Sequence, residues 1–514
     1  MVTDHITDKN NKNLRRTKKM NNIPELKLGL VAVSRDCFPV ELSKKRRDAL
    51  FSTCSSKNIS ITKIETVIEN EKDSLKALDE LKKSNINALV IYLGNFGPEG
   101  PTTILAEKFG GPVMFVAAAE ESQNDLINGR GDAYCGMLNA SYNLGLRKIN
   151  AYIPEYPVGT ADEVANMIAD FAPIAKIVLG IKCLKIFSFG PRPQDFLACN
   201  APIKPLYDLG VEIMENSELD LYDIYLSAKD DPKIDAVAKE MSTELGGGNS
   251  YPDLLKKLAQ YEIALTKFME SNLGASQFGI FANKCWPSFE KYFGFVPCYV
   301  NSRLASRGIP ASCEVDIYGT LSEYMLACAT EMPVTILDIN NSVPKDMYES
   351  AKKEIGDYKH TDLFMGFHCG NTPAGCLVNP KVKYQLIMNR LIESGNEPDI
   401  TRGTLEGQIK PGEITLFRLQ STADCELRSY IAEGDVLNVD PKSFGGIGVI
   451  GIKEMGRFYR HVLIEKKFPH HSGMGFKHVG KSLFAALKML DVNNIYVNLP
   501  SSMLYQSENF FDRQ

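Results

Sequence analysis

The stretch ASCEVDIYG at residues 311–319 places two acidic residues, Glu314 and Asp316, within a run of small and apolar side chains. A run of this composition is typical of a buried or half-buried segment, where an unpaired neutral polar group costs roughly 2–7 kcal/mol on transfer scales and an ionised carboxylate costs more. Either these carboxylates reach water, or a cation lies beside them. The sequence on either side of this stretch indicates which fold buries it and which cation could lie beside it.

Strand-like and helical patterns alternate between residue 26 and this stretch. Leu75, Leu78 and Leu81 recur at helical spacing, and Thr160 with Glu163 fits a capping box that predicts a second helix start. Strands interleaved with helices favour parallel sheets of the doubly wound type. The strand-like runs are LKLGLVAVS (26–34), TKIETVI (62–68), NALVIYLGN (87–95), PVMFVAA (112–118) and LKIFSFGPRPQDF (184–196).

The pattern changes beyond about residue 345, where strand-like segments follow one another with short turns between them. They predict a largely antiparallel sheet or barrel, with one late helix at 480–490 and a final strand at 494–500. The strand-like segments are GEITLFRL (412–419), CELRSYIAEGDVL (425–437), IGVIGIKE (447–454) and FYRHVLIEKKFP (458–469).

These patterns predict three domains after a disordered leader at 1–25. We expect an N-terminal α/β domain at 26–158, ending near the turn-forming YIPEYPVGT, and a central α/β domain at 159–345 that carries the acidic candidates. A C-terminal domain with a mixed β-barrel then covers 346–514. With 514 residues, the chain is too long for one core.

A glycine pattern at 446–451 matches GxGxxG by its letters alone. A dinucleotide-binding fingerprint also needs a preceding strand, a following helix and an acidic residue about 20 positions on. The sequence IKEMGRFYRHVLIEKK that follows has no amphipathic helix start. We therefore interpret these glycines as a β-turn or bulge, not as a nucleotide site.

The composition excludes several classes of partner. A net charge of -5, with 44% hydrophobic and 24% charged residues, gives no basic surface for nucleic acid or for a membrane. The 12 cysteines form no CxxC pair, so we expect reduced thiols and no structural zinc site. The first 22 residues lack a secretory h-region, and no segment offers about 18 apolar residues for a span. These features predict a cytoplasmic protein.

Five residues are candidates for a metal site. Glu314 precedes a predicted helix, and Asp338 in VTILDINN lies 24 positions after Glu314, at what we expect to be a neighbouring strand end. The adjacent histidines of FPHHSG, His470 and His471, lie between a strand and a turn, as does His368 in FHCGN. Two carboxylates with one or two imidazoles suit a divalent ion such as Mn²⁺, Mg²⁺ or Co²⁺. The alternative interpretation is that both acids are helix caps or loop residues.

Taken in order and spacing, ASCEVDIYG, LDINN, FHCGN and FPHHSG resemble the L-fucose isomerase and L-arabinose isomerase superfamily. The resemblance runs from about residue 26 to near the C-terminus and includes GPRPQDF at 190–196 and CWPSFEKYFGF at 285–295. It implies two Rossmann-like α/β domains and a C-terminal domain built round an antiparallel β-barrel. It also implies a homo-hexamer in which the N-terminal domain of one subunit reaches the active site of another.

The resemblance further implies that Glu314, Asp338 and His471 bind Mn²⁺, with Co²⁺ or Mg²⁺ as alternatives. The implied reaction interconverts an aldose and a ketose through a cis-enediol, an intramolecular oxidoreduction in which Glu314 and Asp338 act as base and acid. The metal would then be the cation that the carboxylates in ASCEVDIYG require. Asp316, two residues from Glu314, would point the same way in a regular strand and orient a ligand, or would cap the helix.

Three further residues are expected to contact the sugar: His368, Arg192 in GPRPQDF, and Trp286. Two other functions compete with the isomerase. A non-catalytic sugar-binding or regulatory protein would be expected to lack a ligand residue, and a hydrolase acting on a phosphorylated or sulfonated sugar would need a two-metal carboxylate cluster. The substrate stays open among L-fucose, D-arabinose, L-arabinose and an acidic or sulfonated hexose.

Overall fold

A computed structural model describes residues 20–513, so the leader expected at 1–25 falls mostly outside the described residues. The chain forms two compact units. The N-terminal unit consists of Pro24–Gly180 and Lys481–Val492. The main unit consists of Ile181–Gly480 with the described residues that precede Pro24 and follow Val492.

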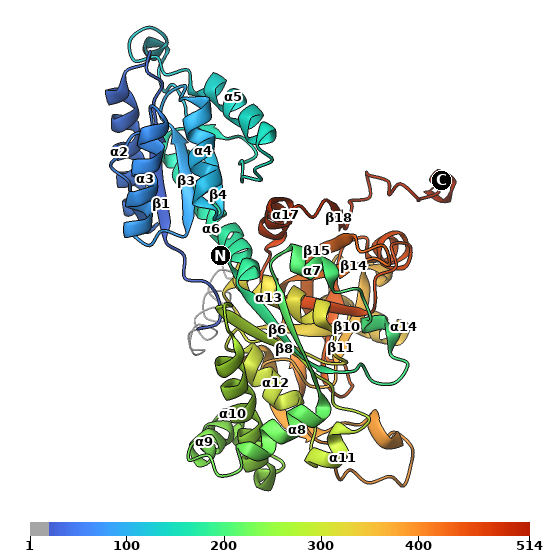
Figure 1. Cartoon of the computed structure of the whole chain (residues 1–514). Helices are drawn as coiled ribbons and strands as arrows, with labels where there is room; N and C mark the ends of the chain where they lie inside the picture. The colour runs from blue at the N-terminus through green and yellow to red at the C-terminus, as the bar shows by residue number, and fades with distance from the viewer. Residues whose placement is uncertain (1–19, 514) are drawn as a thin grey trace. The chain divides into compact units, whose positions relative to one another are not determined.

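The N-terminal unit is built on a five-stranded parallel sheet of order β2-β1-β3-β4-β5, flanked by helices (Figure 1). Strands β1, β3 and β4 are buried along their whole length, as expected for a sheet covered on both faces. This confirms the predicted parallel arrangement. The elements are β1 Leu28–Val33, α2 Val40–Ser56, β2 Ile61–Lys63, α3 Glu71–Lys83, β3 Ala88–Leu93, α4 Glu99–Phe109, β4 Val113–Ala118, α5 Ala133–Leu146, β5 Val158–Gly159 and α6 Ala161–Lys182.

Two helix predictions are confirmed. The capping box at the start of α6 is present, because Thr160 N donates to Glu163 Oε2 at 2.8 Å and Glu163 N donates to Thr160 Oγ1 at 3.4 Å. Helix α3 confirms the helical spacing of the three leucines, although Leu75 is 54% exposed and the buried face consists of Ser74, Ala77 and Leu81.

Helix α6 is long and apolar enough to cross a membrane by length and composition, which the sequence analysis did not anticipate. Of its apolar window, 56% is buried inside the structure. The core helix of a soluble protein meets the same criteria, so α6 alone is weak evidence for a membrane span.

The main unit begins with a four-stranded parallel sheet of order β7-β6-β8-β9. All 14 residues of α13 are buried, because this helix contacts β8 of the parallel sheet and strands β10, β14 and β17 of a second sheet. One hydrophobic core therefore serves both sheets. The elements are β6 Leu184–Gly190, α7 Lys204–Asp208, β7 Glu212–Ser217, α8 Glu218–Ser227, α9 Ile234–Leu245, α10 Leu255–Asn272, β8 Phe278–Ala282, α11 Phe289–Phe293, α12 Cys298–Ala305, β9 Ala311–Ser312 and α13 Ile317–Thr330.

The second sheet has nine strands in the order β12-β13-β16-β11-β10-β17-β14-β15-β18, with an additional pairing of β15 with β16. It is mixed, since β13–β16 and β15–β18 pair in parallel and the other pairs are antiparallel. The elements are β10 Val334–Ser342, α14 Lys345–Ser350, α15 Lys352–Ile355, β11 Leu363–His368, β12 Leu377–Tyr384, β13 Arg402–Ile409, β14 Gly412–Ser421, β15 Leu427–Leu437, β16 Gly446–Gly451, α16 Met455–Phe458, β17 His471–Gly475, α17 Gly480–Met489 and β18 Asn494–Val497.

Two local predictions for this region were wrong. The segment 458–469 does not form a strand: α16 ends at Phe458 and continues as a π-helical turn over Tyr459–Ile464. The glycines at 446–451 are not a turn but form β16, which is buried throughout. At Gly451 a Cβ atom would lie 2.9 Å from the ring of Tyr358, so close packing explains that glycine without a nucleotide.

Candidate active site

A tight turn between β9 and α13 presents Glu314. Glu314 and Val315 have φ angles of 53° and 55°, a left-handed conformation that costs on the order of 1–3 kcal/mol at each non-glycine residue. Val315 N donates to Asn283 O at 2.8 Å, and Asp316 N donates to Cys313 O at 3.1 Å. The regular strand expected through Glu314 and Asp316 was therefore wrong, because β9 ends at Ser312.

Asp316 serves as the N-cap of α13, since its Oδ1 accepts a hydrogen bond from Gly319 N at 2.9 Å. Its cation is Arg418, whose guanidinium donates to both carboxylate oxygens. For Asp316, the positive charge thus comes from a protein side chain, and the expectation that a metal supplies it was wrong.

Three adjacent strands of the nine-stranded sheet supply the other candidates. Asp338 in β10 is the register partner of His471, the first residue of β17. On its other side Asp338 pairs with Phe367, next to His368 at the end of β11. Asp338 therefore lies within a strand of a different sheet, and its expected place at a strand end beside β9 was wrong.

The predicted ligand atoms converge all the same. His471 Nε2 lies 3.4 Å from Glu314 Oε2 and 3.3 Å from Asp338 Oδ1. One ligand atom each from Glu314, His368 and His471 lies within 4.8 Å of the others. The side chains are largely shielded from solvent, with 12% of Glu314, 18% of Asp338 and 1% of His471 exposed.

Three buried atoms at this place lack hydrogen-bond partners among the described residues: Glu314 Oε2, Asp338 Oδ1 and His368 Nδ1. Buried polar atoms are normally satisfied, so such a group calls for an explanation, of which an ion is one. Two carboxylates and imidazole nitrogens match the donor preferences of Mn²⁺ and similar divalent ions. The residues present therefore fit the metal that the family resemblance implies.

The titration of the group reflects its burial. Burial, with the charge of Asp338 as the next cause, raises the pKa of Glu314 to about 8. Burial also raises the pKa of Asp338. For His471, burial alone would lower the pKa, but the neighbouring Cys199 and Asp316 raise it well above its usual value. A bound cation would favour the ionised carboxylates and neutral imidazole.

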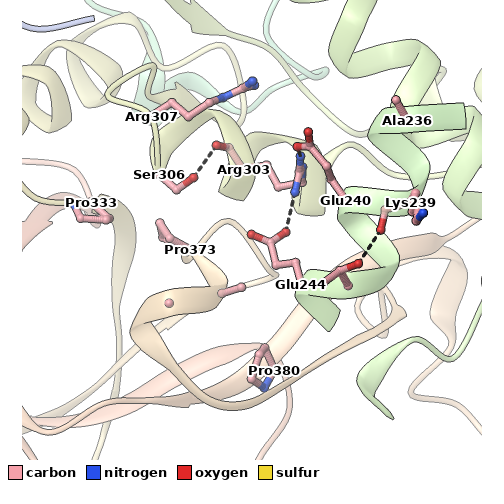
Figure 2. A pocket seen from close by; sticks show the side chains of 13 residues that line it. Ala236, Lys239, Glu240, Glu244, Arg303, Ser306, Arg307, Pro333, Pro373 and Pro380 are labelled. Atoms are coloured by element: carbon pink, nitrogen blue, oxygen red, sulfur yellow. Dashed lines mark hydrogen bonds and ion pairs between the residues drawn. The ribbon is translucent and has the colours of Figure 1, made fainter. Parts of the chain in front are cut away.

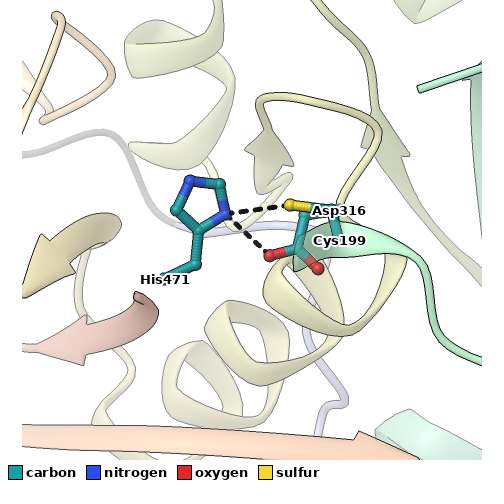
Figure 3. A group of neighbouring side chains, drawn as sticks. All are labelled: Cys199, Asp316 and His471. Atoms are coloured by element: carbon teal, nitrogen blue, oxygen red, sulfur yellow. Dashed lines mark hydrogen bonds and ion pairs between the residues drawn. The ribbon is translucent and has the colours of Figure 1, made fainter. Parts of the chain in front are cut away.

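The second nitrogen of His471 faces away from these atoms. Nδ1 lies 2.8 Å from Asp316 Oδ2 and 3.5 Å from Cys199 Sγ (Figure 3). Burial raises the pKa of Cys199 to about 11, so this thiol is neutral and Asp316 is the ionised partner. The two nitrogens of His471 thus have separate surroundings.

The loop after β6 adjoins the same histidines. The ring of Phe196 lies 5.6 Å from that of His470 and 6.3 Å from that of His471. Arg192, on this loop, donates to Asn200 Oδ1 and is partly exposed. The side chain of Trp286 interacts with the carboxylate of Glu314 and opposes the rise in its pKa. The structure thus brings Trp286 into the group and places Arg192 on a segment that contacts it.

Sequence reasoning missed Phe196, Cys199 and Arg418. Among these, Arg418 had a signal: it is the one charged residue in the run ITLFRL. The proximity of Phe196 and Cys199 depends on tertiary packing and has no local signature.

A separate cavity of about 780 Å³ lies between α9, the end of α12 and residues 373–375 (Figure 2). Its Arg303 pairs with Glu244 at 2.7 Å and with Glu240 at 3.6 Å. None of the candidate site residues lines this cavity. The charge of Arg303 is thus balanced by carboxylates of the protein itself.

Comparison with known proteins identifies the family. Residues 29–182 match the N-terminal domain of fucose/sulfoquinovose isomerase, and 366–498 match the C-terminal domain of L-fucose isomerase. A sulfoquinovose isomerase of Alkalicoccus urumqiensis is 26% identical over 65% of this chain and 70% of its own length. That of Priestia megaterium (strain ATCC 12872 / QMB1551) is 21% identical over 91% of this chain and 98% of its own. That of Clostridium sp. (strain MSTE9) is 25% identical over 57% of this chain and 61% of its own. The chain belongs to the fucose isomerase-like family of aldose–ketose isomerases.

Proposed function

We propose that this chain is a metal-dependent isomerase that interconverts a sulfonated aldohexose and its ketose. The observation that carries the metal dependence is the convergence of Glu314 Oε2 and Asp338 Oδ1, both buried and without hydrogen-bond partners among the described residues, on His471 Nε2. The relatives named sulfoquinovose isomerase support the choice of substrate class.

In this proposal Glu314, Asp338 and His471 hold the ion, with Mn²⁺ expected and Co²⁺ or Mg²⁺ as alternatives. When bound, the ion supplies positive charge that stabilises the negative charge developing on the two adjacent sugar oxygens.

Glu314 and Asp338 also move the proton. One carboxylate removes the proton from C2 of the aldose and the other group returns a proton to C1, while O2 loses a proton and O1 gains one, so that atoms and charge balance through the cis-enediol. Without the ion, burial raises the pKa of Glu314 to about 8. A bound cation would lower it and keep the carboxylate ionised, which is the form that accepts a proton. Trp286 is proposed to orient the Glu314 carboxylate, with which its side chain interacts.

Substrate recognition is assigned to the surrounding residues. His368, which is buried at the end of β11, is proposed to contact the sugar together with Trp286. Arg192 is proposed to bind the sulfonate, because a guanidinium pairs with such anions through two parallel hydrogen bonds. The loop that carries Arg192 also carries Phe196, which packs against His470 and His471.

Three larger features belong to the same proposal. The pairing of β15 with β16 supports closure of β16-β11-β10-β17-β14-β15 into an antiparallel barrel. A stripe of exposed apolar residues on α5 supports a homo-oligomer, proposed to be a hexamer with active sites at subunit interfaces; these residues are Tyr134, Leu138, Tyr142 and Leu146. A cytoplasmic location fits a soluble sugar-converting enzyme.

The test is aldose-to-ketose conversion with EDTA-treated protein, before and after Mn²⁺ is restored, over sulfoquinovose, L-fucose, D-arabinose and L-arabinose. Turnover that requires the metal, prefers sulfoquinovose and is lost in Glu314→Gln is the expected result. Sugar binding without turnover in any of the three metals would instead favour a non-catalytic sugar-binding protein. Metal-dependent turnover of a neutral sugar alone would retain the isomerase and reject the sulfonated substrate.

A further inference from the structure

We propose that Arg418 is a positioning residue, which acts through Asp316 to hold His471 with its Nε2 atom directed at Glu314 and Asp338. The inference rests on the proposed metal site, and it concerns residues that lie behind that site.

Arg418 is held in one orientation by four contacts. It is fully buried in β14 and is the largest fully buried side chain among the described residues. Its Nη1 donates to Asp316 Oδ2 at 2.5 Å and its Nη2 to Asp316 Oδ1 at 2.9 Å. Its Nε and Nη2 donate to Gln420 Oε1 at 3.0 and 2.7 Å. Gln420 is two positions along the strand, so both side chains lie on the same face of β14.

The Asp316 carboxylate is fixed in turn. Besides Arg418, Oδ1 accepts from Gly319 N at 2.9 Å, and Oδ2 lies 2.8 Å from His471 Nδ1. A Cβ atom at Gly319 would lie 2.5 Å from Oδ2. The helix backbone therefore leaves room for this carboxylate only because residue 319 is a glycine.

This arrangement determines which ring nitrogen of His471 carries the proton. An ionised carboxylate accepts and does not donate, so Nδ1 carries the proton in the hydrogen bond to Asp316. In neutral imidazole Nε2 is then the unprotonated nitrogen, the one required for a metal ligand. Arg418 lies on the far side of Asp316, and its recorded hydrogen bonds go to Asp316 and Gln420.

A second buried arginine provides the contrast. Arg303 pairs with Glu262 at 2.6 Å and with Glu244 at 2.7 Å, which joins α12 to α9 and α10. No candidate site residue is among its recorded partners. Arg303 is therefore a matched control for the loss of a buried, ion-paired arginine within the same unit.

The test measures Mn²⁺ affinity directly, by titrating metal-free protein and following the free Mn²⁺ signal by electron paramagnetic resonance. Loss of a group that orients a histidine ligand typically weakens metal binding 10–100-fold, and we expect about this loss in Arg418→Met. Arg418→Lys should lose less because it keeps the charge, and Asp316→Asn should lose affinity to a similar extent as Arg418→Met. Arg303→Met should lower the thermal midpoint while leaving the Mn²⁺ affinity within about twofold.

Unchanged Mn²⁺ affinity in folded Arg418→Met, or a loss just as large in Arg303→Met, would overturn the positioning role. If Arg418→Met fails to fold, Arg418→Lys and Asp316→Asn decide the matter by the same criterion. If the unaltered protein binds none of Mn²⁺, Co²⁺ and Mg²⁺, the proposed metal site itself is wrong. That outcome is distinct from failure of the Arg418 inference, which requires tight binding in the unaltered protein.

Discussion

Gly319→Ala should destabilise the main unit, although a glycine-to-alanine change inside a helix ordinarily stabilises by roughly 0.5–1 kcal/mol. The new Cβ atom would lie 2.5 Å from Asp316 Oδ2 and 2.6 Å from Ile336 Cδ1. The isoleucine end can rotate away. The carboxylate is held by Arg418, Gly319 N and His471, so it can move only by breaking hydrogen bonds.

The expected magnitude follows from those bonds. Hydrogen bonds to charged groups contribute about 1.5–3 kcal/mol each. The loss of two of the hydrogen bonds to the Asp316 carboxylate therefore lowers the free energy of unfolding by about 3–6 kcal/mol. The gain in helix propensity offsets about 1 kcal/mol. The net prediction is a destabilisation of about 2–5 kcal/mol, accompanied by weaker Mn²⁺ binding because His471 loses its fixed partner.

The chain offers a selective probe for this measurement. Trp286 is the single tryptophan of the sequence and belongs to the main unit, so its fluorescence during urea unfolding reports that unit. Gly456→Ala in α16 is the matched control, because the nearest atoms to its new Cβ belong to Thr361 at 3.4 Å, an ordinary contact. If Gly319→Ala were as stable as Gly456→Ala and bound Mn²⁺ as tightly as the unaltered protein, the described position of the Asp316 carboxylate would be refuted.

Three further predictions concern the ionisation of the site, its metal and its substrate. Burial raises the pKa of Glu314 to about 8 from its usual value of 4.5, so the folded state retains this proton after the unfolded state has lost it. The contribution of Glu314 to stability is therefore present below about pH 4.5 and is lost as the pH rises to about 8. The urea midpoint of metal-free protein, followed by Trp286 fluorescence, should fall between these pH values, and it should fall less steeply in Glu314→Gln. Equal pH dependence of the midpoint in the two proteins would contradict the raised pKa of Glu314. Mn²⁺ at 100 times its dissociation constant should stabilise the main unit by about 2.7 kcal/mol in the same assay, and EDTA should reverse the effect; no shift would argue against a site in the folded state. Arg192→Ala should raise KM for sulfoquinovose about 10–100-fold, as expected for the loss of a charge-assisted bidentate contact, with little change for a neutral sugar; an equal effect on both would show that Arg192 does not read the sulfonate.

Local sequence patterns predicted much of the fold. The apolar runs that became β1, β3 and β4 carry their own signal, as does the box of Thr160 and Glu163 at the start of α6. The segment 458–469 was misread because its β-favouring residues outweighed their spacing. Phe458, Val462 and Leu463 are the buried residues of that segment, and the separation of four positions between Phe458 and Val462 fits one face of a helix.

The candidate ligand residues were identified as motifs, but their arrangement in space was not predicted. Asp338 and His471 become register partners only when β10 and β17 pair, and no local rule predicts that pairing. The left-handed turn at Glu314 and Val315 is equally hidden, because neither residue favours a positive φ. Tertiary contacts, such as the bond from Val315 N to Asn283 O at 2.8 Å, hold it in place.

The membership of α17 in the N-terminal unit has a consequence for any attempt to isolate that unit. The chain passes between the two units at four points, near residues 23, 180, 480 and 492. A fragment that ends at residue 180 would lack the helix whose Leu483, Ala486 and Leu487 are buried, and would lose the ion pair of 2.7 Å from Lys481 to Asp170. The N-terminal unit is thus discontinuous in the amino-acid sequence. An isolated version would require residues 481–492 to be joined by a linker to one end of 24–180.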